Sequence, residues 1–162
     1  MLANQEEQWE KMKIVDFLSA SAVVIDLAAT NKKGALEELA SLLAKEGKIT
    51  DAKFVVDILL EREKLGSTGI GQGIAIPHAK TDKATGLTAA FGLSRRGIAF
   101  DSLDGELVHI FFLLVAPPDA AGAHLKALAR ISRLLKDKFI RQALREIKDV
   151  NEVIKIIRKE DQ

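Results

Sequence analysis

One short stretch of the chain brings together residue types that can handle an oxyanion. It reads STGIGQGIAIPH from residue 67 to residue 78. Glycines permit positive φ angles and close backbone approach, so successive N–H groups can form an anion-binding nest to which hydroxyl groups add donors. The stretch therefore predicts a loop that holds a phosphate-like group, and its lining residues are Ser67, Thr68, Gly69, Gly71 and Gly73.

A nucleophile stands at the end of the same stretch. A neutral imidazole nitrogen can attack a phosphoryl group, and histidine is partly neutral near physiological pH. Pro77 restricts the backbone immediately before His78, which helps to preorganise the ring. A lone histidine is more often a structural residue in a turn. The glycines and hydroxyl groups that precede His78 favour phosphate chemistry instead.

The glycine spacing does not fit a nucleotide-binding loop. The dinucleotide fingerprint is Gly-x-Gly-x-x-Gly and must open a helix, whereas this stretch is Gly-x-Gly-x-Gly and residues 74–77 alternate like a strand. A P-loop ends in Gly-Lys-Ser/Thr, and the first lysine after these glycines is Lys80. Neither nucleotide interpretation is retained.

Two more residues are candidates for the same site. His124 is expected in the first turn of a helix, where the helix dipole disfavours the imidazolium and leaves a neutral N–H donor; a polar cap is the alternative. Arg62 ends the helix before the glycine stretch, where a guanidinium could neutralise phosphate charge or belong to a solvated helix face. His109 is interpreted as structural, or as a residue that supports the site without touching the phosphate. Without His-x-x-x-His spacing or cysteines, no metal site is expected.

The composition excludes several classes of function. The 162 residues contain no cysteine, which excludes disulfides and thiolate catalysis. The 24 basic and 23 acidic residues are interspersed and give a net charge of +1, which offers no support for a nucleic-acid partner. The N-terminus lacks the apolar core of a signal peptide, and the longest apolar run, residues 110–118, is far below the roughly 20 residues that span a bilayer. We expect a cytoplasmic protein without membrane insertion.

The helices and strands that position these residues are indicated by changes in the spacing of apolar residues along the sequence. Helices are expected after caps at Asn31 and at Thr50 or Asp51, and again in three segments from Ala120 onward. Strand patterns occupy residues 22–26, 87–94 and 107–116, and the last is apolar at almost every position, as in a central strand covered on both faces. The pattern predicts a three-layer α/β/α sandwich with a small mixed β-sheet, as one domain over residues 12–162 behind a polar extension over residues 1–11.

The stretch from Arg62 to His78 resembles the active-site signature of the fructose/mannitol-type (type 2) enzyme IIA domains of the bacterial phosphoenolpyruvate:sugar phosphotransferase system. The similarity extends over nearly the whole chain from about Met12, including Asp101-x-x-Asp104. It implies an α/β/α sandwich that accepts a phosphoryl group from phospho-HPr and passes it to a cysteine of a IIB domain, with no metal or organic cofactor.

The resemblance also implies residue roles. His78 matches the histidine that is phosphorylated on Nε2, His124 matches the second active-site histidine, and Arg62 matches the arginine near the phosphate. Ser67 and Thr68 fall in the loop that lines the site.

The branch of the family is a separate question. Without a cysteine the chain has no IIB acceptor, and without a spanning helix it has no IIC domain, so we expect a stand-alone IIA. Such chains resemble the nitrogen-regulatory branch, in which phosphorylation modulates partner proteins; a fructose/mannitol-type IIA that feeds a separate IIB is the alternative. A protein of another class, a non-phosphorylated binding module, could share the fold, whereas a hydrolase would need a nucleophile–base–acid set that is not evident.

Overall fold

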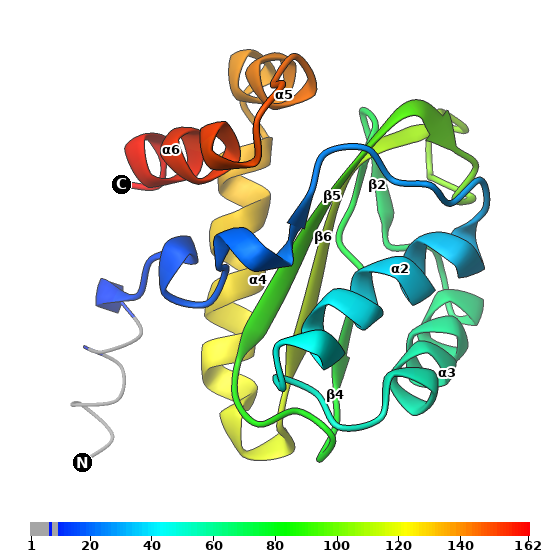
Figure 1. Cartoon of the computed structure of the whole chain (residues 1–162), viewed down its shortest axis with the longest axis vertical. Coiled ribbons are helices and arrows are strands. Elements are labelled where there is room, and N and C mark those ends of the chain that lie inside the picture. Colours follow the sequence, from blue (N-terminus) through cyan, green and yellow to red (C-terminus); the bar gives the residue numbers. More distant parts are fainter. Residues whose placement is uncertain (1–6, 8–9) are drawn as a thin grey trace.

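A mixed β-sheet lies between two layers of helices in the computed structural model, which describes residue 7 and residues 10–162 (Figure 1). Most of the predicted extension over residues 1–11 lies outside the described residues. The strands are β1 (Val23–Val24), β2 (Gly69–Gly71), β3 (Ile74–Ala75), β4 (His78–Lys80), β5 (Thr88–Ile98) and β6 (Val108–Ala116). The α-helices that follow residue 12 are α2 (Lys32–Lys45), α3 (Ala52–Lys64), α4 (Ala121–Leu135), α5 (Lys138–Arg145) and α6 (Val150–Glu160). Short 3₁₀ turns are η1 (Ile14–Asp16), η2 (Ala20–Ala22) and η3 (Pro118–Ala120).

The sheet is organised around β6. Its strand order is β1-β5-β6-β3-β2, and β4 also pairs with β6 beyond the end of β3. β5 runs antiparallel to β6, whereas β3 and β4 run parallel to it. Every residue of β6 except His109 is buried, which confirms the predicted central strand and the mixed sheet.

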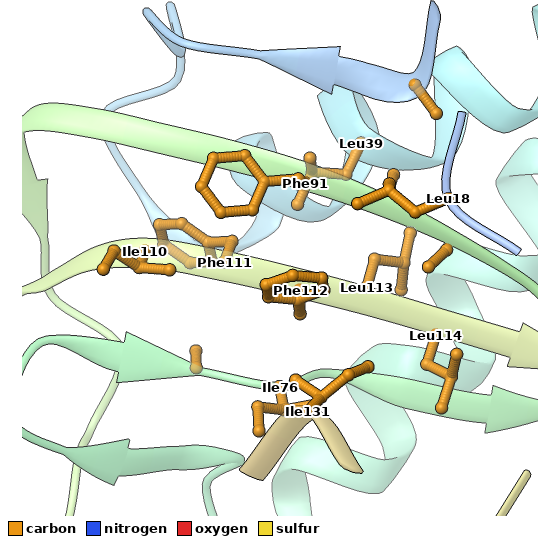
Figure 2. Packing of buried hydrophobic residues seen from close by; sticks show 14 of the residues in the cluster. Leu18, Leu39, Ile76, Phe91, Ile110, Phe111, Phe112, Leu113, Leu114 and Ile131 are labelled. Atoms are coloured by element: carbon orange, nitrogen blue, oxygen red, sulfur yellow. The ribbon is translucent and has the colours of Figure 1, made fainter. Parts of the chain in front are cut away.

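Helices cover both faces of the sheet, as the sandwich prediction requires. Figure 1 shows α2 and α3 on one side and α4 on the other, with α5 and α6 packed beside α4. Aromatic and aliphatic side chains of β5 and β6 fill the centre, and Leu39 of α2 and Ile131 of α4 reach the sheet from the two helical layers (Figure 2). Phe91 and Phe112 meet edge to face with ring centroids 5.2 Å apart.

Local sequence signals set the ends of the first two helices. The side chain of Asn31 accepts a hydrogen bond from Gly34 N at 2.7 Å at the start of α2. Asp51 does the same for Phe54 N at 3.0 Å at the start of α3. Each side chain satisfies an N–H group that the first turn leaves without an intrahelical partner. Both predicted caps are confirmed, with Asp51 as the second.

The strand predicted over residues 22–26 is shorter in the structure. β1 consists of Val23 and Val24 alone and pairs in parallel with Phe91 and Gly92 of β5. β1 lies at the edge of the sheet. After it, the chain makes a further backbone hydrogen bond to β5, from Leu27 N to Leu93 O at 2.9 Å. The β-branched pattern therefore marks the strand, while the tertiary pairing sets its length.

Candidate phosphoryl-transfer site

The backbone around His78 fixes which ring nitrogen can act as a nucleophile. His78 opens β4 and pairs with Leu114 of β6. Its Nδ1 lies 2.8 Å from the carbonyl oxygen of Ile76. A carbonyl oxygen can only accept, so Nδ1 carries the hydrogen and a neutral ring keeps its lone pair on Nε2. The half-buried ring is therefore oriented with Nε2 as the reactive atom.

His124 faces His78 from the opposite element. It lies in the first turns of α4, and the two ring centroids are 5.7 Å apart with an interplanar angle of 55°. His124 is buried, with 5% of its surface exposed. Among the described residues, nothing lies within hydrogen-bonding reach of its buried Nε2. The structure thus brings the two predicted histidines together and leaves a ring nitrogen of the second available.

The surroundings of His124 keep it neutral. Its pKa is lowered from 6.5 to about 4, first by burial and then by the positive charges of His78 and Lys80. At neutral pH the ring therefore holds one N–H group and no net charge. Such a ring can donate a hydrogen bond to an oxyanion without repelling a cation beside it.

Lys80 is a site residue that the sequence analysis did not select. It lies two residues after His78 on β4, so the two side chains leave the same face of the strand. Its ammonium is close enough to His124 to lower the pKa of that ring. The period of two along the strand was the signal that could have identified Lys80.

Arg62 lies in the last turn of α3, which packs against β4. Its Nη1 donates to the carbonyl oxygen of Gly66 at 2.8 Å. Within the described chain, no hydrogen bond or ion pair joins Arg62 to His78 or His124. Arg62 as a whole is half-buried, and its guanidinium is anchored to the loop that leads toward the glycine stretch.

The hydroxyl groups of Ser67 and Thr68 are used inside the protein. Ser67 Oγ donates to the carbonyl oxygen of Phe100 at 2.5 Å, and Thr68 Oγ1 donates to the carboxylate of Glu63. Thr68 is buried, with 4% of its surface exposed. In this structure neither hydroxyl hydrogen is directed at the histidine pair, because carbonyl and carboxylate oxygens accept from them.

The glycine stretch forms a β-hairpin in place of the predicted oxyanion loop. Gly71 pairs with Ile74 across a two-residue turn in which Gln72 has φ 59° and Gly73 has φ 79°. Positive φ at both central residues is the requirement of a type I′ turn, whose twist matches that of the flanking strands. The carboxylate of Asp104 accepts from Gln72 N at 2.8 Å and fixes the turn from the side.

The hairpin turn lies away from the histidine pair. The carbonyl oxygen of Gly73 accepts from the backbone N–H groups of His109 and Ile110, whereas His78 pairs with Leu114. Four residues along β6 correspond to roughly 13 Å. The structure therefore does not bring Gly71 and Gly73 to His78, because the hairpin pairs with the opposite end of β6.

Gly69 has a packing role within the same hairpin. A Cβ atom at this position would lie 2.4 Å from Ser102 Oγ and 3.1 Å from Ser67 Oγ. Its backbone N–H donates to Ser67 Oγ at 2.9 Å, so it is not free to bind an anion. The backbone at residue 69 passes so close to Ser102 that only glycine fits there.

His109 is structural, as the sequence analysis predicted. Its Nδ1 bonds to the carbonyl oxygen of Ser94 at 2.9 Å, across the β5–β6 pair. In the residues that the structure describes, no cluster of three or more histidine, cysteine or acidic side chains could hold a metal ion. None of the helices in that part of the chain is long and apolar enough to cross a membrane.

Comparisons with known proteins identify the family of the chain. Residues 16–160 match the family described as "Phosphoenolpyruvate-dependent sugar phosphotransferase system, EIIA 2". A nitrogen regulatory protein of Bradyrhizobium diazoefficiens is 42% identical over 148 residues, which cover 90% of this chain and 95% of that protein. A fructose-specific EIIABC component of Bacillus subtilis is 38% identical over 150 residues, and the chain spans only 24% of its length.

Solved structures point the same way. The nitrogen regulatory protein IIA-Ntr from Neisseria meningitidis superposes with a TM-score of 0.83 at 37% identity, covering 89% of this chain and 98% of that one. Domains of this family are phosphotransfer components. The match over most of the chain shows that the protein belongs to the type 2 enzyme IIA family of the phosphoenolpyruvate-dependent sugar phosphotransferase system.

Proposed function

We propose that the chain is a phosphoryl carrier that accepts a phosphoryl group from a phosphorylated HPr-type protein on Nε2 of His78. The observation that carries this proposal is the geometry of the histidine pair. Ile76 holds the hydrogen on Nδ1 of His78, and His124 offers a buried, neutral ring 5.7 Å away between centroids. A nucleophile with a fixed tautomer beside a neutral donor is what in-line phosphoryl transfer requires.

In the transfer step, the Nε2 lone pair of His78 attacks phosphorus as the bond between phosphorus and the donor protein breaks. The donor keeps the bonding electron pair, and Nδ1 keeps its hydrogen on the Ile76 carbonyl. Charge on the equatorial oxygens is offset by Lys80 and by an N–H group of His124, with Arg62 as a further cation at the end of α3, the helix that packs against β4. These residues do not trap the phosphoryl group, because none of them forms a covalent bond to phosphorus.

The test is phosphorylation by phosphoenolpyruvate, enzyme I and an HPr-type carrier. We expect the protein to acquire one acid-labile, base-stable phosphate, and the His78→Ala variant to acquire none. His109→Gln serves as the matched control. His109 lies at the other end of β6, so this variant should be phosphorylated at the wild-type rate. Full labelling of His78→Ala would refute the proposal.

The supporting residues predict a graded effect in the same assay. His124→Ala and Arg62→Ala are expected to fold and to label more slowly, since each removes a donor or a cation and leaves the nucleophile in place. General acid–base and electrostatic groups of this kind contribute about 10²-fold or more to rates. Unchanged rates in both variants would assign the two residues to structure alone.

We further propose a nitrogen-regulatory role, in which the phosphorylation state of His78 changes the affinity for a regulated protein. Its support is the similarity to nitrogen regulatory proteins over nearly their whole length. The alternative is delivery of the phosphoryl group to a IIB cysteine for sugar uptake, which the similarity to a fructose-specific component supports. Incubating the labelled protein with a purified fructose-type IIB domain separates the two: fast, complete loss of label to IIB favours sugar transport, and retention favours regulation.

A further inference from the structure

We propose that Glu63 is a positioning residue for phosphoryl transfer, which acts on His78 through Thr68 and Ile76. This inference rests on the proposed function of His78. It adds a residue that touches neither the phosphoryl group nor the nucleophile. Glu63 fixes the position of the Ile76 carbonyl group, which accepts from Nδ1 of His78 and so determines the tautomer of that ring.

Glu63 is an unusual residue for the end of a helix, because its carboxylate is buried. The side chain is 4% exposed, although Arg62 and Lys64 on either side of it are partly or fully exposed. Lys32 Nζ, from the first turn of α2, lies 3.1 Å from Oε1. A buried ion pair contributes little net stability compared with apolar residues of similar shape. The role of the Lys32–Glu63 ion pair is therefore to hold the carboxylate in position.

The carboxylate holds Thr68 through two donors, which make three contacts. The backbone N–H of Thr68 lies 3.2 Å from each oxygen of Glu63, and the Thr68 hydroxyl donates to Oε2. Hydrogen bonds to an ionised acceptor are stronger than those between neutral groups. They fix Thr68 in the loop between α3 and β2.

Thr68 in turn holds Ile76. The carbonyl oxygen of Thr68 accepts from Ile76 N at 3.0 Å, and the carbonyl oxygen of Ile76 accepts from Nδ1 of His78 at 2.8 Å. The peptide after Pro77 is held separately, because its carbonyl oxygen accepts from Leu114 N at 2.9 Å. β6 thus anchors the chain on one side of the His78 acceptor, and Glu63 anchors it on the other.

The same carboxylate also places Arg62. Glu63 fixes Thr68, and two residues earlier in the same loop the carbonyl oxygen of Gly66 accepts from Arg62 at 2.8 Å. One buried group therefore holds both the loop that binds the arginine and the segment that orients the nucleophile. Loss of the Glu63 carboxylate should move the Arg62-binding loop relative to the segment that orients His78.

The experiment measures two properties of Glu63→Gln and Thr68→Val. The first is the tautomer of His78, read from two-bond ¹H–¹⁵N correlations at alkaline pH, where a histidine is neutral. The second is the rate of phosphorylation by the HPr-type carrier. We expect the wild type to show the Nδ1–H tautomer and the variants to show a mixture of tautomers. Because a misplacement of 1 Å costs about 10²-fold, a smaller shift should slow transfer about tenfold.

Two controls separate positioning from general destabilisation. Thr68→Ser keeps the hydroxyl and should restore both the tautomer and the rate. Glu61→Gln lies on the exposed side of the same helix, where Glu61 pairs only with Lys64 at 2.7 Å among the described side chains, and should match the wild type. If Glu63→Gln does not fold, the Thr68→Val and Thr68→Ser pair tests the same link.

The outcomes distinguish this inference from the proposed function. A wild type that takes no phosphate refutes the proposed function, while the tautomer comparison still tests Glu63. A folded Glu63→Gln or Thr68→Val variant that keeps the wild-type tautomer of His78 overturns the inference, whatever its transfer rate.

Discussion

The burial of His124 predicts a specific loss of stability in acid. The ring is 5% exposed and its pKa is lowered to about 4, first by burial and then by the charges of His78 and Lys80. In the unfolded chain the ring is solvated and titrates near its ordinary value of 6.5. The unfolded state therefore binds a proton at a pH where the folded state does not, and protons favour unfolding.

The size of the effect follows from the two pKa values. The stabilisation is fully present above pH 6.5 and is lost as the pH falls toward the folded-state pKa. At about 1.36 kcal/mol for each pKa unit, His124 should cost about 1 kcal/mol of unfolding free energy at pH 6, about 2 at pH 5 and about 3 at pH 4. Below that pH both states are protonated and the difference stops growing.

The assay is urea unfolding of the wild type and of His124→Gln at several pH values between 4 and 8. Carboxylates that titrate in the same range contribute equally to both proteins and cancel in the difference between them. The wild type should lose about 3 kcal/mol more than the variant between pH 8 and pH 4. Parallel stability curves for the two proteins, or a His124 resonance that titrates at an ordinary pKa, would refute the reasoning.

Three other predictions test neighbouring parts of the structure. Phosphorylation should raise the pKa of His124, because an anionic group then stabilises the imidazolium, and an NMR titration of the phosphorylated protein would detect it. Gly69→Ala should destabilise the fold, and adding Ser102→Ala should recover part of the loss, since the new Cβ would meet the buried Ser102 Oγ; denaturant midpoints measure both. Lys32→Met should cost about 3 kcal/mol by urea unfolding, because it leaves the buried carboxylate of Glu63 without its cation.

Signals that depend on a few adjacent residues predicted much of the fold. Asn31 and Asp51 satisfy N–H groups in the first turns of their own helices, so their role is visible without knowledge of the rest of the chain. The apolar run of β6 likewise requires cover on both faces wherever the strand lies. The histidine pair was found because the residue types before His78 and around His124 were each chemically suggestive, and the fold then placed them together.

Signals that depend on distant partners could not be decided from adjacent residues. Alternating glycines fit an anion nest and a type I′ hairpin equally well, and only pairing of the hairpin with the start of β6 decides between them. Glu63 was not selected from the sequence, because its buried partners Lys32 and Thr68 are not its neighbours on the helix face. The same holds for Lys80, whose importance depends on the position of His124.

The histidine pair itself follows from the connection after β6. β4 runs parallel to β6, so His78 lies near the end where β6 finishes, opposite Leu114. The chain leaves β6 at Ala116, passes through one 3₁₀ turn at Pro118–Ala120 and enters α4 at once. A connection this short returns the first turns of α4 to the same end of the sheet, which brings His124 over His78. The site therefore needs no long loop: a parallel strand and a tight return after the central strand place both rings.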